Sequence, residues 1–143
     1  MSAILSRRAA LAGAGGLLFA FSMTPARGQT ETGKGGGPSK RGLPGSLDDT
    51  PRLDAWIRID ATGKATILTG KAELGQGLKT AILQIAAEEL RLPLARLSLV
   101  PADTGRTADE GYTAASHSIQ DSGTAIRHAA AQVRVLLIEE AAR

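Results

Sequence analysis

Residues 65–90 read ATILTGKAELGQGLKTAILQIAAEEL, and this stretch sets the expected architecture. It opens with a β-prone run from Ala65 to Gly70. From Leu78 to Leu90 the apolar residues recur every three or four positions, which is the period of one face of an α-helix. Pro93 follows, and proline cannot continue a helix. The stretch therefore predicts a strand, a loop and a largely covered helix. Its apolar positions are Leu78, Ile82, Ile85, Ala86 and Leu90, flanked by Leu83 and Ala87.

The residues before this stretch predict the other half of a β-hairpin. Leu53–Asp60 alternates in the manner of a strand, with Trp56 on one face and Ile57 on the other. Asp60 and Gly63 then supply turn chemistry, a capping carboxylate and a residue that tolerates positive φ. We therefore expect two antiparallel strands joined by a tight turn.

The residues after it predict a third strand and a second helix. The strand is expected at Arg96–Val100, and the polar segment 101–118 is expected to be an irregular loop. Ser118 and Asp121 fit a capping pattern for the long helix that follows. The expected fold class is α+β, a small β-β-α-β-α unit. The apolar face of the last helix comprises Ile126, Ala129, Val133, Leu136 and Leu137.

Residues 1–28 have the three parts of an export leader. Arg7 and Arg8 end the basic region, an apolar run extends from Ala9 to Phe21, and Thr24-Pro25-Ala26 offers small residues for cleavage. The apolar run is shorter than the roughly 20 residues that a membrane-spanning helix needs. We therefore expect a twin-arginine signal peptide and a periplasmic mature protein, with the general secretory route as the alternative.

The remainder divides into a linker and one domain. Residues 29–52 are rich in glycine, proline, serine and charge, which is typical of a flexible linker. Residues 53–143 are enough for one small core, and a core of this size is marginal by itself. Because the last helix stops at Arg143 without a cap, and because two such apolar helices need covering, we expect a partial domain that continues in a larger protein.

Composition narrows the range of functions. Three of the 17 basic residues lie in the leader, which has no acidic residue, so the mature chain carries 14 basic and 14 acidic side chains. Both phenylalanines also lie there, which leaves one Trp and one Tyr for stacking on bases. Nucleic-acid binding is therefore not expected. The absence of cysteine excludes disulfides and thiolate-held iron–sulfur clusters from this chain.

The run Gly75-Gln76-Gly77 is the most informative candidate site. Two glycines let the backbone approach a ligand closely. The start of the following helix offers free N–H groups, which suit an anionic or oxo-bearing group. Gly-x-Gly is also common at tight turns, so the run alone does not identify a site. Position 80 is threonine, so the run is not a dinucleotide fingerprint.

Other polar side chains are better explained by structural roles. Ser116, His117 and Asp121 have the residue types of a hydrolase triad, yet a triad needs groups that converge from separate elements. Capping of the helix is the favoured interpretation. His117 has no second imidazole or thiol nearby, so no metal ligands are assigned. We expect Asp103, Asp109, Glu110 and His128 to face water or cap turns.

Several segments together carry a family resemblance. They are Trp56–Ile59, Thr69–Thr80, Gln84–Leu90, Pro101–Thr104, Gly111–Ser118 and Gln120–Gly123. They resemble the molybdopterin-binding large subunit of the xanthine dehydrogenase and aldehyde oxidase family. The exported branch typified by the isoquinoline 1-oxidoreductase β subunit is the most similar, and its members also begin with twin-arginine leaders.

The resemblance implies roles for five residues. Gln76 would donate a hydrogen bond from its amide to an oxo ligand of molybdenum, and Gly75 and Gly77 would let the molybdenum–molybdopterin cofactor approach. Ser116 and His117 would lie near the same cofactor. The family oxidises N-heteroaromatic or aldehyde substrates with water as the oxygen source, and electrons leave through a small [2Fe–2S] subunit.

The resemblance also implies that this chain is incomplete. The family's glutamate base has no counterpart here, and Glu73, Glu88 and Glu89 do not occupy its position. We therefore expect an inactive N-terminal part that works with the remainder of the large subunit, the small subunit and the twin-arginine translocase. Two alternatives stay open: a stand-alone exported α+β binding or adaptor domain, and an unrelated periplasmic enzyme that uses Ser116, His117 and Asp121.

Overall fold

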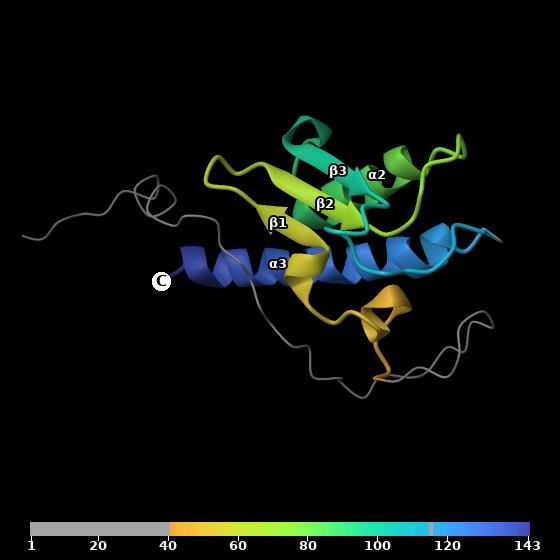
Figure 1. Ribbon diagram of the computed structural model, residues 1–143. Coiled ribbons are helices and arrows are strands. Elements are labelled where there is room, and N and C mark those ends of the chain that lie inside the picture. Colours follow the sequence, from red (N-terminus) through yellow and green to blue (C-terminus); the bar gives the residue numbers. More distant parts are fainter. Residues whose placement is uncertain (1–40, 115) are drawn as a thin grey trace, which may run out of the picture.

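The computed structural model describes residues 41–114 and 116–143. The predicted signal peptide and the first part of the predicted linker lie outside these residues. Within them the order of strands and helices is β-β-α-β-α, which confirms the predicted α+β unit (Figure 1). No helix in this described part is both long enough and apolar enough to cross a membrane.

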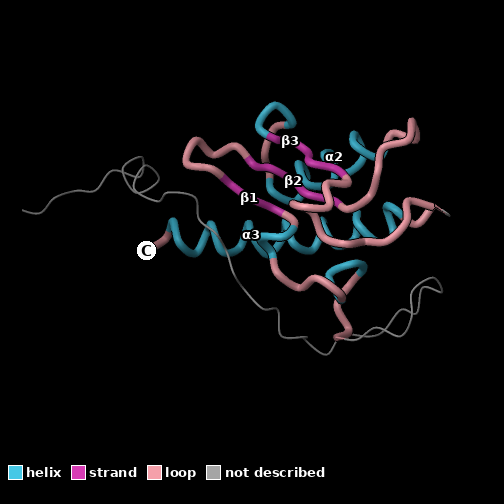
Figure 2. The backbone as a smooth tube through the Cα atoms, in the orientation of Figure 1, coloured by secondary structure: helices cyan, strands magenta, loops and turns pink. Residues whose placement is uncertain are grey.

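The sheet has three strands in the order β1-β2-β3, and β2 is central (Figure 2). Strand β1 (Ile57–Ile59) runs antiparallel to β2 (Ala65–Thr69). Strand β3 (Leu97–Pro101) runs parallel to β2 and begins one residue later than the sequence predicted. A parallel pair needs a crossover connection, and α2 (Leu78–Leu90) supplies it.

Helix α2 has the bounds that its apolar period predicted. Leu78, Ile82, Ala86 and Leu90 are buried, whereas Ile85 is only half-buried. Pro93 alone would let the helix continue to residue 92. The helix ends at Leu90 because Arg91 adopts a left-handed conformation with φ 56°. Its backbone N–H donates to the carbonyl of Ala87, which closes the last turn.

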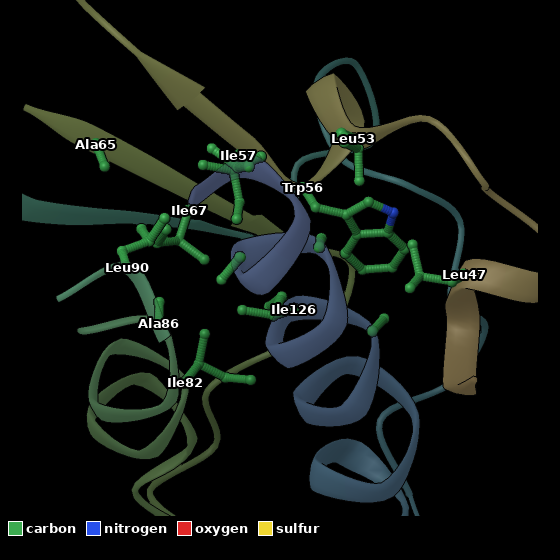
Figure 3. Packing of buried hydrophobic residues seen from close by; sticks show 14 of the residues in the cluster. Leu47, Leu53, Trp56, Ile57, Ala65, Ile67, Ile82, Ala86, Leu90 and Ile126 are labelled. Atoms are coloured by element: carbon green, nitrogen blue, oxygen red, sulfur yellow. The ribbon is translucent and has the colours of Figure 1, made fainter. Parts of the chain in front are cut away.

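The core lies between the sheet and the two helices, α2 and α3 (Thr124–Ala141), which cover the same face (Figure 3). Trp56, Ile67, Ile82 and Ile126 are all fully buried there. The alanines of α3 keep the helices and the sheet close together because they have no bulk beyond Cβ. The buried apolar positions of α3 are Ala125, Ile126, Ala129, Ala130 and Val133.

The first strand is shorter than the alternation of residues 53–60 predicted. Leu53–Ala55 forms a 3₁₀ turn in which the Leu53 carbonyl accepts the Trp56 N–H. Because Trp56 precedes the strand, its ring packs in the core together with Ile57 instead of on the opposite face. The predicted turn is confirmed: the Asp60 carboxylate accepts N–H groups of the turn, and Gly63 has φ 78°.

The packed core also includes residues that precede Leu53. Gly45–Asp48 forms a 3₁₀ turn, and Leu43 and Leu47 belong to the hydrophobic cluster. The Asp48 carboxylate accepts the backbone N–H groups of Arg41 and Leu43 at 2.7 and 3.0 Å. This segment, expected to be the end of the linker, therefore has fixed contacts with the domain.

The last helix begins differently from the predicted capping pattern. A π-helical turn at Ile119–Gly123 precedes α3, and the Ser118 side chain makes no capping hydrogen bond. The Asp121 carboxylate points to Lys71 instead of to the helix N–H groups. The capping prediction was wrong because a buried ammonium group outside the helix binds this carboxylate.

Candidate functional site

The loop of residues 70–77 leaves the carboxyl end of the central strand and enters α2. Gly75 and Gly77 have φ values of 96° and 80°, a conformation that residues with a Cβ rarely adopt. A Cβ added at either glycine would meet no atom within 4 Å. The two glycines are therefore required by the backbone conformation, and the space beside them is open to a ligand.

The Gln76 side chain is exposed, but its amide has a fixed orientation. The amide nitrogen Nε2 donates to the Ala72 carbonyl at 2.9 Å, and Oε1 accepts the Leu74 N–H at 2.6 Å. If the amide were reversed, Nε2 would face the Leu74 N–H and Oε1 would face the Ala72 carbonyl, so neither hydrogen bond could form. In the described part of the chain the second amide hydrogen has no partner, so it remains available to an acceptor outside the loop.

Some N–H groups at the start of α2, which the sequence analysis expected to be free, already have a partner in the loop. The Glu73 carboxylate accepts the N–H groups of Gly75, Gly77 and Lys79 at 2.8, 3.1 and 2.8 Å. These hydrogen bonds, that from Lys79 first, hold the pKa of Glu73 below its usual range. The loop thus binds its own anion at the helix N-terminus, a favourable place for negative charge, and the donor that it offers outward is the Gln76 amide.

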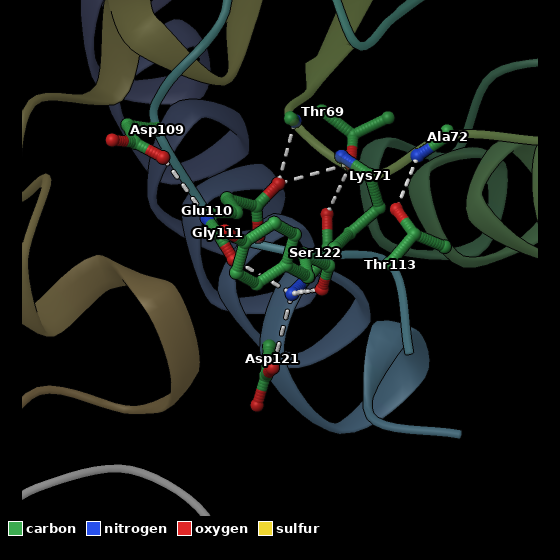
Figure 4. Close-up of polar contacts among 11 residues, drawn as sticks. Thr69, Lys71, Ala72, Asp109, Glu110, Gly111, Thr113, Asp121 and Ser122 are labelled. Carbon is green, nitrogen blue, oxygen red and sulfur yellow. Dashed lines mark hydrogen bonds and ion pairs between the residues drawn. The ribbon is translucent and has the colours of Figure 1, made fainter. Parts of the chain in front are cut away.

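A second loop, residues 110–114, packs against the start of the first (Figure 4). The Glu110 oxygen Oε2 accepts the N–H of Gly70 at 2.7 Å, and the Thr113 hydroxyl oxygen accepts the N–H of Ala72 at 2.7 Å. Glu110 was expected to face water or cap a turn of its own loop. It was assigned wrongly, because its carboxylate binds the end of β2, forty residues away in sequence.

A chain of buried hydroxyl groups supports this contact. The Thr69 hydroxyl lies 2.6 Å from the Ser122 hydroxyl and 3.0 Å from Glu110 Oε2. An ionised carboxylate only accepts, so Thr69 donates to Glu110 and Ser122 must donate to Thr69. The other Glu110 oxygen, Oε1, is buried and has no partner in the described chain.

Lys71 lies at the centre of the contact between the two loops. Lys71 is only 3% exposed, and a lysine is almost never buried to this extent unless its ammonium group has partners. The ammonium nitrogen Nζ donates to the carbonyls of Glu110 and Tyr112 at 2.7 and 3.2 Å. It also lies 3.3 Å from Asp121 Oδ2. Its three donors thus match three acceptors (Figure 4).

The remaining predicted residues occupy the second loop or its surroundings. Ser116 is exposed with φ 59°, and His117 is half-buried. Both follow Thr113, which contacts the first loop, but no hydrogen bond joins either residue to Gln76 within the described residues. The Asp121 N–H donates to the His117 carbonyl, while the Asp121 carboxylate binds Lys71. The arrangement is therefore not that of a hydrolase triad.

Three further predictions on polar residues are confirmed. Asp103 and Asp109 each accept an N–H group of their own turn, from Gly105 and Gly111. His128 is exposed on the outer side of α3. Among the described residues no group of three histidine, cysteine or acidic side chains could hold a metal ion. What these loops offer is a hydrogen-bond donor beside open glycines.

The sequence profile of the molybdopterin cofactor-binding domain family matches residues 20–143 of the chain. The chain belongs to this family. It is a molybdopterin-binding domain of the xanthine dehydrogenase and aldehyde oxidase class, as the family resemblance of several segments implied. The specific similarity to isoquinoline 1-oxidoreductase stays a prediction.

Named relatives agree with this assignment. The molybdopterin-binding domain is 33% identical to a nicotinate dehydrogenase subunit of Pseudomonas putida over 137 residues, 96% of this chain and 11% of the relative. It is 37% identical to aldehyde oxidase 2 of Cavia porcellus over 75 residues, 52% of this chain and 6% of that protein. It is 29% identical to xanthine dehydrogenase/oxidase of Mus musculus over 92 residues, 64% and 7% respectively.

The chain thus spans about a tenth or less of the length of these relatives. No solved structure matches it.

Residue types and spacing alone did not reveal the polar contacts that join the two loops of the molybdopterin-binding domain. Thr69, Lys71, Glu110, Thr113 and Ser122 are distributed over more than fifty residues of sequence. The only local signal was a lysine directly after an apolar strand, a position from which a side chain can turn toward the interior. The partners of that lysine lie on segments whose proximity is set by the tertiary fold.

Proposed function

We propose that the chain supplies the first part of the molybdenum-cofactor site of an exported hydroxylase that oxidises N-heteroaromatic or aldehyde substrates. The observation that carries this proposal is the Gly75-Gln76-Gly77 loop. Its amide is held in one orientation with one hydrogen unused by the described residues, and both flanking glycines face open space. A bound cofactor with an oxo ligand needs a donor of this kind.

The residues present fit such a group. Gln76 would hold an oxo ligand through its second amide hydrogen, and the bare backbone of Gly75 and Gly77 would admit the bulk of the cofactor. Ser116 and His117 would line the neighbouring side, since they follow Thr113, whose hydroxyl oxygen accepts the N–H of Ala72 in the first loop. The cofactor, when bound, supplies redox chemistry that transfers oxygen from water to carbon. The protein's own share is to bind and orient.

The complete activity would require further protein. Glu73, the acidic residue of the loop, has no role as a free base, because its carboxylate is occupied by three N–H groups of its own loop. Ile119, Val135 and Ile138 are large apolar residues that remain exposed along the last helix and the turn before it. They suit contact with the remainder of a large subunit, and a small [2Fe–2S] subunit would receive the electrons, since the chain has no cysteine.

Export is part of the same proposal. Arg7 and Arg8 precede an apolar segment in the manner of a twin-arginine leader. A cofactor inserted in the cytoplasm requires transport of a folded protein, which this route provides. The periplasm would then be the place of action, and conversion of both arginines to lysine should retain the protein in the cytoplasm.

A chimera tests the cofactor proposal. The matching segment of the Pseudomonas putida nicotinate dehydrogenase subunit would be replaced by this chain, and molybdenum and pterin would be measured per purified subunit. We expect Gln76→Ala to lower the molybdenum content about tenfold, since hydrogen bonds to charged groups contribute about 1.5–3 kcal/mol. Gln84→Ala is the matched control, because Gln84 is an exposed glutamine on α2. Equal molybdenum content in both variants would contradict the role of Gln76.

A further inference from the structure

We propose that Lys71 is the positioning residue that fixes the loop of residues 110–114 against the loop of residues 70–77. This inference rests on the proposed function only for the claim that both loops border the cofactor. Gln76 lies in the first loop, and Ser116 and His117 follow the second loop in the sequence. Lys71 lies five residues before Gln76 in the sequence, and its ammonium group binds two backbone carbonyls of the second loop.

The geometry of the ammonium group explains why one side chain can hold two segments. Its three hydrogens diverge in space, and its acceptors come from Glu110, Tyr112 and Asp121. Two are loop carbonyls, and the third is a carboxylate at the start of the last helix. The loop is thereby held between the end of the sheet and the helix that packs on the sheet.

Burial makes this contact hard to replace. Lys71 is 3% exposed, so water cannot take over its hydrogen bonds. Without the ammonium group, the carbonyls of Glu110 and Tyr112 lose their donor and the Asp121 carboxylate loses its counter-charge. An arginine has a planar guanidinium whose donors lie in one plane, and it does not match acceptors that diverge around a single nitrogen.

Two backbone amides report directly on this contact. The Gly70 N–H donates to the Glu110 carboxylate, and the Ala72 N–H donates to the Thr113 hydroxyl oxygen. They lie on either side of Lys71, and both of their acceptors belong to the second loop. If Lys71 positions that loop, its loss exposes these two amides to water while the core strands stay closed.

The first experiment measures amide hydrogen exchange by NMR in the full 143-residue chain. Lys71→Met keeps the apolar stem and removes the charge. We expect Gly70 and Ala72 to exchange about tenfold faster, with no change at Ile67 or Ile126 in the core. Lys64→Met is the matched control, because Lys64 is an exposed lysine in the β1–β2 turn. Unchanged exchange at Gly70 and Ala72 would overturn the inference, and so would equal acceleration at every amide.

The second experiment tests whether the ammonium group itself is required. The chain has no cysteine, so Lys71→Cys carries one thiol, which can be alkylated in denaturant before refolding. Reaction with 2-bromoethylamine restores an ammonium at lysine length, whereas iodoacetamide adds a neutral group of similar length. Slow exchange of Gly70 and Ala72 should return only with the amine. Equal recovery with both reagents, or with neither, would contradict a role for the charge.

If the Lys71 variants do not fold, a second variant still tests the inference. Asp121→Asn removes the negative charge beside the buried lysine and leaves the lysine in place, so the same two amides should exchange faster than in the unmodified chain. No acceleration in that variant would count against the inference. These readouts need no cofactor. A chimera that fails to load molybdenum would therefore refute the proposed function alone, and unchanged exchange would refute the positioning role alone.

Discussion

The carboxylate of Asp121 lies 3.3 Å from the ammonium nitrogen of Lys71, so a residue at the start of the last helix binds the loop that follows the central strand. The lysine is buried and the carboxylate is 35% exposed. A pair of this kind is worth less than a fully buried one, because water screens the exposed partner. It still joins two segments that lie far apart in the sequence.

Asp121→Asn should lower the free energy of unfolding by about 1–2 kcal/mol. This range lies between the median of about 0–1 kcal/mol for surface pairs and the roughly 3–5 kcal/mol lost when a buried pair is broken. Asparagine keeps the size of the side chain and one acceptor oxygen, so the loss reports mainly on charge. Urea denaturation at neutral pH measures it.

Ser118→Ala is the informative comparison for that variant. The Ser118 hydroxyl makes no capping hydrogen bond, so we expect a change within about 0.5 kcal/mol. Loss of a functioning N-cap would instead cost typically about 1 kcal/mol. A loss of that size would show that Ser118 caps the helix in solution.

Gly77→Ala should show whether the loop of residues 70–77 binds the cofactor as proposed, by comparison with a glycine in an ordinary turn. Gly77 and Gly63 have nearly equal φ values, 80° and 78°, and a side chain at such φ costs roughly 1–2 kcal/mol. Thermal denaturation should therefore show similar losses in Gly77→Ala and Gly63→Ala. Only Gly77→Ala should also lower the molybdenum content of the chimera, because its methyl group enters the space proposed for the cofactor.

Equal molybdenum content in the two glycine variants would place the cofactor away from Gly77. A larger loss of stability at Gly63 has a separate explanation, since its methyl group would meet the Arg96 side chain at 3.0 Å. That contact is with the end of a flexible side chain, which can move.

The hydrogen bonds that Glu73 accepts should make the stability of the loop of residues 70–77 depend on pH. The pKa of Glu73 is lowered from its ordinary value of 4.5 by the N–H groups that it accepts. A lowered folded pKa means that the contribution of this carboxylate to stability is complete above the ordinary value. It is lost as the pH falls through the lower, folded value.

NMR titration can follow this loss. The amide signals of Gly75, Gly77 and Lys79 should shift together with a midpoint below the ordinary pKa of 4.5, and Glu73→Gln should abolish the shared transition. A midpoint at or above the ordinary value would mean that the carboxylate does not hold the loop in solution.

Thr69→Val should destabilise the domain by about 1–3 kcal/mol, the cost of leaving buried polar groups without partners. Thr69 is fully buried and contacts Ser122 and Glu110. Thr66→Val, on the opposite face of the same strand, removes the hydroxyl of a half-buried residue beside Ser98. We expect a smaller loss there. Equal losses measured by urea denaturation would mean that the Thr69 hydrogen bonds add nothing beyond those of an ordinary strand threonine.

The local elements were largely predictable from the sequence. The bounds of α2 follow from apolar residues at intervals of three and four, and the β1–β2 turn follows from Asp60 and Gly63. These features depend on neighbours within a few residues, where period and backbone preference dominate. For Gly75 and Gly77 the sequence predicted a close approach of the backbone, and the structure added that both residues have positive φ.

Errors appeared where a distant group competed for a side chain. Trp56 does not follow the predicted strand alternation, because its ring has more contact in the core than it would have on the opposite face of the sheet. Asp121 does not cap the helix as predicted, because its carboxylate binds the buried ammonium group of Lys71. In both cases the local pattern was present, and a tertiary contact outweighed it.

The loop of residues 70–77 has some features that follow from the sequence and others that depend on the tertiary structure. The sequence by itself determined that this loop has two glycines around an amide, and it indicated the molybdopterin-binding family through motifs local to each segment. Only the tertiary structure decided that Glu73 occupies the helix N-terminus and that Lys71 joins the second loop to the first. Side chains separated by about forty or fifty residues meet because the sheet and helices bring them together, and no local preference encodes that distance.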